Sequence, residues 1–82
     1  MDAHTVHIEL GGDATDEDYT ALIRLMHFEF GAELITPATE SPMKFAPLRS
    51  AIAPLGLRSM IIKRIRDLSI STEPFVEFSW IQ

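Results

Sequence analysis

The residues that decide the fold are Thr15–Gly31, with the sequence TDEDYTALIRLMHFEFG. Thr15 followed three residues later by Asp18 has the form of a capping box, which predicts that a helix begins here. Gly31 suits the position just after the last turn, because glycine readily takes the left-handed conformation that ends many helices. The sequence therefore predicts a helix that runs to about Phe30.

This predicted helix has apolar residues on two sides. One stripe at helical spacing contains Tyr19, Leu22, Ile23, Met26 and Phe30, and a second contains Ala21, Leu25 and Phe28. A helix that packs against one sheet needs a single apolar stripe. The second stripe predicts that the helix also contacts another layer or a partner.

Strands are predicted near both ends of the chain. Thr5–Leu10 alternates apolar and polar residues, as a half-buried strand does, and Phe75–Ile81 alternates in the same way. Leu57–Leu68 has the pattern of a second main helix. Pro54 and Gly56 are expected to break the helical structure that precedes it.

Shorter elements are expected in the middle of the chain. Glu33–Thr36 and Met43–Ala46 are candidate strands, and Pro47 favours the start of a short helix over Leu48–Ala53. The resulting order predicts the α+β class, as a small two-layer sandwich. A ferredoxin-like βαββαβ arrangement is favoured, and a β-α-α-β layer with an irregular middle is the fallback.

The length of 82 residues predicts a single domain, residues 1–82. The first and last strands are expected to be neighbours. One apolar core is predicted, made of Val6, Ile8, Leu10, Tyr19, Leu22, Ile23, Met26, Ile61, Ile65, Leu68, Val76, Phe78 and Trp80.

Composition excludes several classes of protein. The chain contains no cysteine, which excludes a disulfide framework, a cysteine zinc site and a thiol nucleophile. The first residues lack the pattern of a signal peptide, and no apolar run is long enough to span a membrane. We therefore expect a cytoplasmic protein that makes no use of a membrane.

The charge is unevenly distributed. Residues 1–40 carry nine acids and one base, a net charge of −8, whereas residues 41–82 carry three acids and six bases, a net charge of +3. Such a chain presents an acidic face and a basic face to different partners, unless the two halves neutralise each other in the fold.

Two histidines near the N-terminus resemble a metal-binding pair. His4 and His7 are three residues apart, however, and on a strand this spacing places them on opposite faces. We therefore expect no metal site, with His4 exposed near the N-terminus and His7 pointing outward.

A catalytic alternative rests on the outward face of the first strand. His7 and Glu9 share this face, and Glu77 and Ser79 join them if the last strand pairs antiparallel with the first. Histidine and carboxylates act as general acids and bases when they surround a pocket. A second subunit would have to cover the open face, so this alternative is a small dimeric α+β-barrel enzyme.

Direct nucleic-acid binding is not expected on the sheet, because His7, Glu9 and Glu77 are the wrong residues for it. Arg58, Lys63 and Arg66 form a secondary basic face on the second helix. A Walker A loop, a GxSxG elbow and a GxGxxG motif are all lacking from the sequence, and no catalytic residue or cofactor is assigned.

The leading hypothesis is a non-enzymatic protein-binding domain. Its acidic half would dock on a basic partner surface, for example on a nucleic-acid-binding protein, because acids mimic the charge of nucleic acid and steer association. Phage-encoded inhibitors such as anti-CRISPR proteins, immunity proteins and antitoxins are analogues at the level of class alone. A self-associating accessory domain, as a homodimer, is a further alternative. The expected partner-binding residues are Asp16, Glu17, Leu25, Phe28, Glu29 and Glu33.

Overall fold

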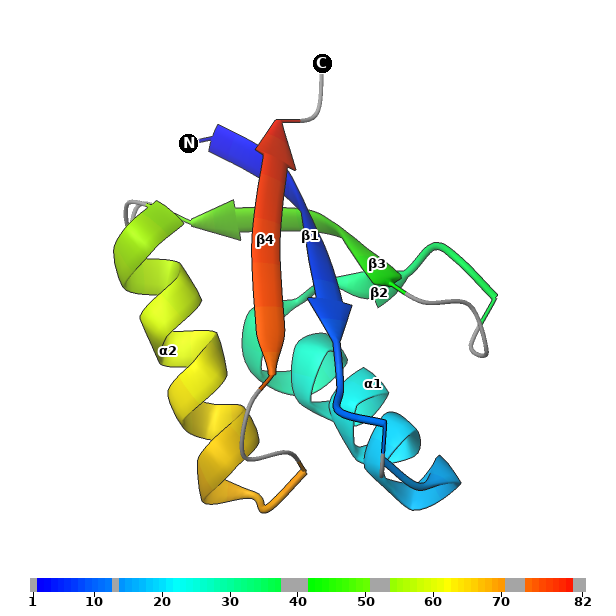
Figure 1. Ribbon diagram of the computed structural model, residues 1–82. Coiled ribbons are helices and arrows are strands. Elements are labelled where there is room, and N and C mark those ends of the chain that lie inside the picture. The colour runs from blue at the N-terminus through cyan, green and yellow to red at the C-terminus, as the bar shows by residue number, and fades with distance from the viewer. Residues whose placement is uncertain (1, 13, 38–41, 51–53, 71–73, 81–82) are drawn as a thin grey trace.

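A computed structural model describes residues 2–12, 14–37, 42–50, 54–70 and 74–80. Its elements follow the order β1 (Asp2–Glu9), α1 (Asp16–Phe30), β2 (Glu33–Leu34), β3 (Met43–Ser50), α2 (Pro54–Asp67) and β4 (Phe75–Trp80). Within these ranges the strands form one antiparallel sheet in the order β2-β3-β1-β4 (Figure 1). The predicted α+β class is confirmed.

β1 lies inside the sheet and pairs with β3 on one side and with β4 on the other. The first and last strands are therefore neighbours, as predicted. Val6 and Ile8 are fully buried, which confirms the alternation expected for a strand with one covered face. Their partners on the adjacent strands that belong to the buried core are Phe45, Met43 and Val76.

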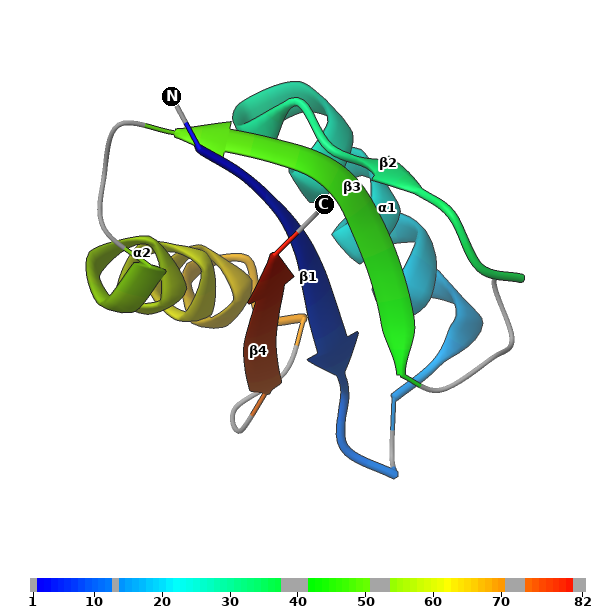
Figure 2. The ribbon, with the colours of Figure 1, turned by 90° about the horizontal axis from the view of Figure 1, so that it is seen from above.

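Both helices pack on the same face of the sheet. α1 contacts β2 and β3, while α2 contacts β4, so the two helices cover opposite halves of the sheet (Figure 2). One apolar cluster joins these layers, and the helices contribute to it Leu22, Leu25, Met26, Leu57, Ile61 and Ile65. The two-sided apolar character of α1 therefore has a structural basis, because Leu25 of its second stripe also reaches the core.

The middle of the chain differs from its prediction. β3 continues through Pro47 to Ser50, where a short helix over Leu48–Ala53 was expected; residues 51–53 lie outside the described ranges. Pro47 fits in the strand because it lies at a register shift, between the pair His4–Leu48 and the pair Val6–Phe45. Irregular positions of this kind tolerate a residue that cannot donate a ladder hydrogen bond.

The start of α2 also corrects the prediction. α2 begins at Pro54 and includes Gly56. These two residues therefore belong to α2 and do not break the helical structure before it. Proline is tolerated here because the first N–H groups of a helix have no acceptor within the helix.

The predicted core is confirmed at seven positions: Val6, Ile8, Leu22, Met26, Ile61, Ile65 and Val76 are buried. Leu10, Tyr19 and Ile23 are half-buried against the core, and Leu68 is 48% exposed, so its assignment to the core is wrong. The side chains of Phe78 and Trp80 lie outside the described part of the structure, although their backbones pair with β1.

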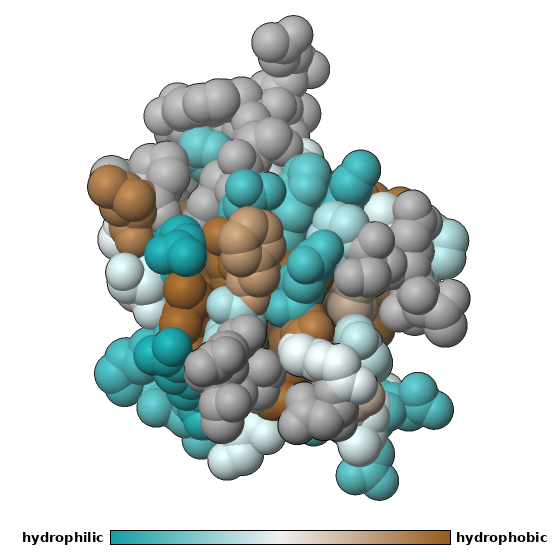
Figure 3. Space-filling model, in the orientation of Figure 1, coloured by the Kyte–Doolittle hydropathy of each residue, from teal (hydrophilic) through white to brown (hydrophobic). Residues whose placement is uncertain are grey.

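Apolar side chains also reach the surface. Figure 3 shows hydrophobic residues between hydrophilic ones on the face that it draws. Isolated exposed apolar residues are normal, whereas those that line a common hollow mark interaction sites. Two of the exposed apolar residues, Phe28 and Leu68, line the same groove.

Candidate functional site

Helix α1 builds the main wall of this groove, and both of its ends are fixed by local hydrogen bonds. The Thr15 hydroxyl oxygen accepts from the Asp18 N–H at 3.2 Å, and the Asp18 carboxylate accepts from the Thr15 N–H at 2.9 Å. At the other end Gly31 has φ +67°, and its N–H donates to the carbonyl of His27. The predicted capping box and C-terminal glycine are confirmed, and they fix where α1 begins and ends.

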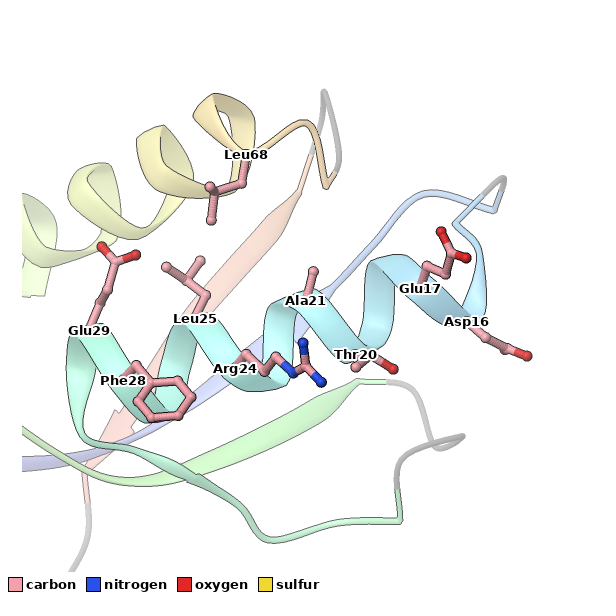
Figure 4. Close-up of a pocket in the computed structure, with 9 residues that line it drawn as sticks. All are labelled: Asp16, Glu17, Thr20, Ala21, Arg24, Leu25, Phe28, Glu29 and Leu68. Atoms are coloured by element: carbon pink, nitrogen blue, oxygen red, sulfur yellow. The ribbon is translucent and has the colours of Figure 1, made fainter.

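The groove runs along α1 and has a volume of about 540 Å³. Its second wall comes from Leu68, just after the end of α2, and Figure 4 shows this residue on the α2 side of the groove, across from Ala21 and Leu25. The described residues that line the groove are Asp16, Glu17, Thr20, Ala21, Arg24, Leu25, Phe28, Glu29 and Leu68.

The groove has an apolar centre and a polar rim. Leu25 is only 3% exposed and forms the floor, whereas Phe28 is 77% exposed and Leu68 48% exposed at its sides. Asp16 and Glu17 are exposed at the end where α1 begins. An apolar centre with polar groups around it is the usual anatomy of a protein interface.

Most of the predicted partner-binding residues come together in this groove. Asp16, Glu17, Leu25, Phe28 and Glu29 all line it. Leu25 belongs to the floor and to the core, so it supports the groove rather than projecting from it.

Glu33 is the predicted partner-binding residue that the groove does not contain. It begins β2, beyond the end of α1, and its carboxylate contacts Nδ1 of His27. The ring of His27 in turn meets the ring of Phe28 edge-on, with centroids 4.6 Å apart. Glu33 is thus linked to the groove through neighbours rather than as part of its lining.

Glu29 connects the two helices. Arg64 of α2 donates from Nε and Nη2 to the two carboxylate oxygens of Glu29, at 2.8 and 2.9 Å. The hydrogen bonds from Arg64 lower the pKa of Glu29, and the same pair raises the pKa of Arg64. The charge of Glu29 is therefore paired within the chain. Within the described ranges, Asp16 and Glu17 are the acids at the rim that form no such ion pair with α2.

Several groove features could not be found by sequence reasoning. Charge patterning offered no reason to pair Glu29 with Arg64, which is 35 residues away. Leu68 was assigned to the core because its spacing from Ile61 and Ile65 is helical, but it lies just past the last residue of α2.

The secondary basic face lies on another side of α2. A hollow of about 480 Å³ is lined by Arg58, Lys63 and Arg66, together with Asp67 and Pro74 among others. Arg58 donates from Nε to the carbonyl of Val76 at 2.9 Å, and Lys63 donates to Asp67 at 2.9 Å, which lowers the pKa of Asp67. Arg58 and Lys63 therefore have structural partners within the chain.

The open face of the sheet carries the residues of the catalytic alternative. His7 is half-buried there and pairs in register with Glu77 of β4 and Lys44 of β3. Ser79 pairs in register with Thr5, and its side chain lies outside the described part of the structure. The predicted antiparallel pairing of the first and last strands thus brings His7 and Glu77 side by side on the exposed face.

His4 corrects the prediction of an exposed N-terminal histidine. It is 2% exposed and lies on the opposite side of β1 from His7, at the level of Leu48. The two histidines do not converge, as their spacing predicted. Across the described ranges, no cluster of three or more histidine, aspartate or glutamate residues is arranged to hold a metal ion.

Comparisons with known proteins identify no relative of this chain. No protein-family model, curated protein or solved structure matches the chain. In the described part of the chain, neither helix is long and apolar enough to cross a membrane.

Proposed function

We propose that this chain is a non-enzymatic protein-binding domain that docks on a basic surface of a partner protein through the groove along α1. The observation that carries the proposal is the composition of this groove. It combines two exposed acids, Asp16 and Glu17, with the exposed ring of Phe28 and an apolar floor. Acids of this kind steer a basic partner toward the groove, and the aromatic ring supplies the anchor that holds it.

Binding rather than catalysis is supported by the chemistry of the lining. Among the described residues, the nine that line the groove include no histidine, the most frequent general base, and no serine or cysteine for a histidine to activate. Its volume falls in the range of small-molecule sites, about 300–1,000 Å³, but its charged groups lie on an exposed rim rather than converging inside.

The class of partner follows from charge. Residues 1–40 carry a net charge of −8, and the acids at the start of α1 face outward. A nucleic-acid-binding protein offers the complementary surface, because its basic groove already binds phosphates. Inhibitors encoded by phages, immunity proteins and antitoxins remain the class-level analogues of this proposal.

A ferredoxin-like arrangement of the domain is part of the same proposal. β3 is antiparallel to both β1 and β2, so β1 and β2 run parallel with β3 inserted between them. Together with the element order β1-α1-β2-β3-α2-β4, this relation supports the split βαβ type.

The proposed function is tested by capture from a lysate of the organism that encodes the chain, with quantitative mass spectrometry. Wild type is compared with Glu17→Lys in the groove and with Glu77→Lys on the open sheet face, which makes the same change of charge. We expect Glu17→Lys to lose proteins that wild type and Glu77→Lys retain. A thermal melt of each variant shows whether the helix is intact, because a lysine in the first turn opposes the helix dipole.

Two results would contradict the proposal. Identical sets of captured proteins for wild type and a folded Glu17→Lys would remove the groove as the docking site. Loss of the captured proteins by Glu77→Lys alone would move the site to the open face of the sheet, where His7 lies.

A further inference from the structure

The shape of the groove restricts what can fill it. α1 and α2 cover different halves of the sheet, and the groove follows α1 from Asp16 to Glu29. At the usual rise of 1.5 Å per residue this is a length of about 20 Å. A groove of this length along one helix accommodates about four turns of a further helix laid beside α1.

The backbone of both walls argues against an extended occupant. A strand that binds a protein gains its affinity from main-chain hydrogen bonds to a free sheet edge. The groove is lined instead by α1 and by Leu68 at the end of α2, and the backbone groups inside a helix already bond to each other. An extended segment placed here would gain no main-chain hydrogen bonds from a sheet edge, whereas a helix satisfies its backbone internally.

The spacing of the apolar residues fits a helical occupant. Ala21, Leu25 and Phe28 stand at i, i+4 and i+7 along α1 and form one apolar stripe in the groove, with Leu25 at the floor and Phe28 exposed. Stripes at these spacings pack against a second helix. The occupant therefore presents a matching apolar stripe to Ala21, Leu25 and Phe28.

Charge fixes the direction of that helix. The acids Asp16 and Glu17 mark the N-terminal end of the groove, whereas Phe28 marks the other end. Lysine and arginine are most favourable in the last turn of a helix, where they also suit its own dipole. An occupant that runs antiparallel to α1 places such a basic last turn against Asp16 and Glu17, and it pairs the opposite ends of the two helix dipoles.

We infer that the groove takes an amphipathic helix of a partner protein, which lies antiparallel to α1 and carries lysine or arginine in its C-terminal turn. This inference rests on the proposed function and specifies the element of the partner that is recognised. A second copy of this chain is a poorer occupant. The basic residues near the end of its α2 are already paired within the chain, Arg64 with Glu29 and Lys63 with Asp67.

The direct test uses three synthetic, fluorescently labelled peptides of about 15 residues, close to the length of α1. The first has leucines at helical spacing and arginines in its last turn. The second has the same composition with the arginines in its first turn. The third is the first peptide with a proline at its centre, which breaks the helix. Fluorescence anisotropy against the full chain gives their affinities.

We expect the first peptide to bind about fivefold more tightly than the second, the size of effect expected for exposed charges and helix dipoles. The proline peptide should bind at least about tenfold more weakly, because a central proline removes a hydrogen bond of the bound helix and clashes with the preceding turn. Glu17→Lys should abolish the preference for the first peptide over the second, and Phe28→Ala should weaken both.

Equal or reversed affinities of the first two peptides, undiminished binding of the proline peptide, or no binding at all would each overturn the inference. Light scattering after size exclusion measures the oligomeric state and so tests the other occupant, a second copy of this chain. A dimer that Phe28→Ala dissociates would place that second copy in the groove and overturn the inference. The lysate comparison of Glu17→Lys with Glu77→Lys distinguishes a failure of this inference from a failure of the proposed function. If that comparison succeeds while the peptides fail, the groove binds a partner by something other than an antiparallel helix.

Discussion

Replacing Phe28 by alanine separates binding from stability. Phe28 is 77% exposed, so folding buries less than a quarter of its surface, about 45 Å² of the ~200 Å² that a phenylalanine can bury. This area contributes about 1 kcal/mol to the free energy of unfolding. Alanine recovers about 0.5 kcal/mol of that through its higher helix propensity. We therefore expect Phe28→Ala to lower stability by only about 0.5 kcal/mol.

The same substitution should have a much larger effect on binding. A partner that covers Phe28 removes roughly 150 Å² of apolar surface from water, which is worth at most about 4 kcal/mol. Aromatic anchors at interfaces cost about 2 kcal/mol or more when truncated. A loss of 2 kcal/mol weakens affinity about 30-fold.

Two matched variants complete the experiment. Leu25→Ala, at the buried floor of the groove, should cost about 2–5 kcal/mol of stability. Phe75→Ala removes another half-exposed aromatic ring, which pairs in register with Glu9 on the sheet, away from the groove. We expect it to leave binding unchanged.

Urea unfolding measures the stability of each variant, and surface plasmon resonance measures its affinity for the captured partner. The reasoning is refuted if Phe28→Ala lowers the free energy of unfolding by more than about 2 kcal/mol, because the ring would then be covered within the folded chain. It is equally refuted if Phe28→Ala is stable and binds the partner as wild type does.

Three further substitutions test other parts of the structure. Thr15→Ala should lower stability by about 1 kcal/mol in urea unfolding, because it removes the hydroxyl that accepts from the Asp18 N–H; an unchanged midpoint would mean that this bond does not hold the start of α1. Glu29→Gln should lower the melting temperature most at neutral pH. The hydrogen bonds from Arg64 depress the pKa of Glu29 below its ordinary value of about 4.5. The stabilisation by the ion pair is therefore present above that value and is lost as pH falls through the depressed pKa. A gap between Glu29→Gln and wild type that persists at the lowest pH would contradict this. His7→Ala should leave the biological activity within about threefold of wild type, because His7 lies on the sheet face away from the helices; a loss of activity of about 100-fold, ~2.7 kcal/mol, with the fold intact would favour the catalytic alternative.

Local signals explain why part of the fold could be predicted from the sequence. The capping residues of α1 act on their immediate neighbours, so Thr15, Asp18 and Gly31 mark its ends without reference to the rest of the chain. Strict alternation has the same local character, and it identified β1 and β4. These signals depend on residues a few positions apart, which is the range that a single sequence displays directly.

Errors arose where distant contacts override local preference. Pro47 and Leu48 read locally as the start of a helix, but Leu48 is buried opposite His4 of β1, and this pairing holds the segment in β3. The same limit applies to the prediction of the candidate site. The acids and Phe28 were recognised from their pattern along α1, whereas the tie between Glu29 and Arg64 depends on how two separate elements pack.

The two bulky residues of the second apolar stripe of α1 differ in exposure. Leu25 belongs to the core and is 3% exposed, whereas Phe28 is 77% exposed, although the ion pair between Glu29 and Arg64 brings α2 to this end of α1. A polar residue at position 28 would keep the same core and favour solubility. An exposed aromatic ring at helical spacing from a buried leucine, with acids at the far end of the same groove, is explained if a further helix completes the layer that α1 and α2 begin.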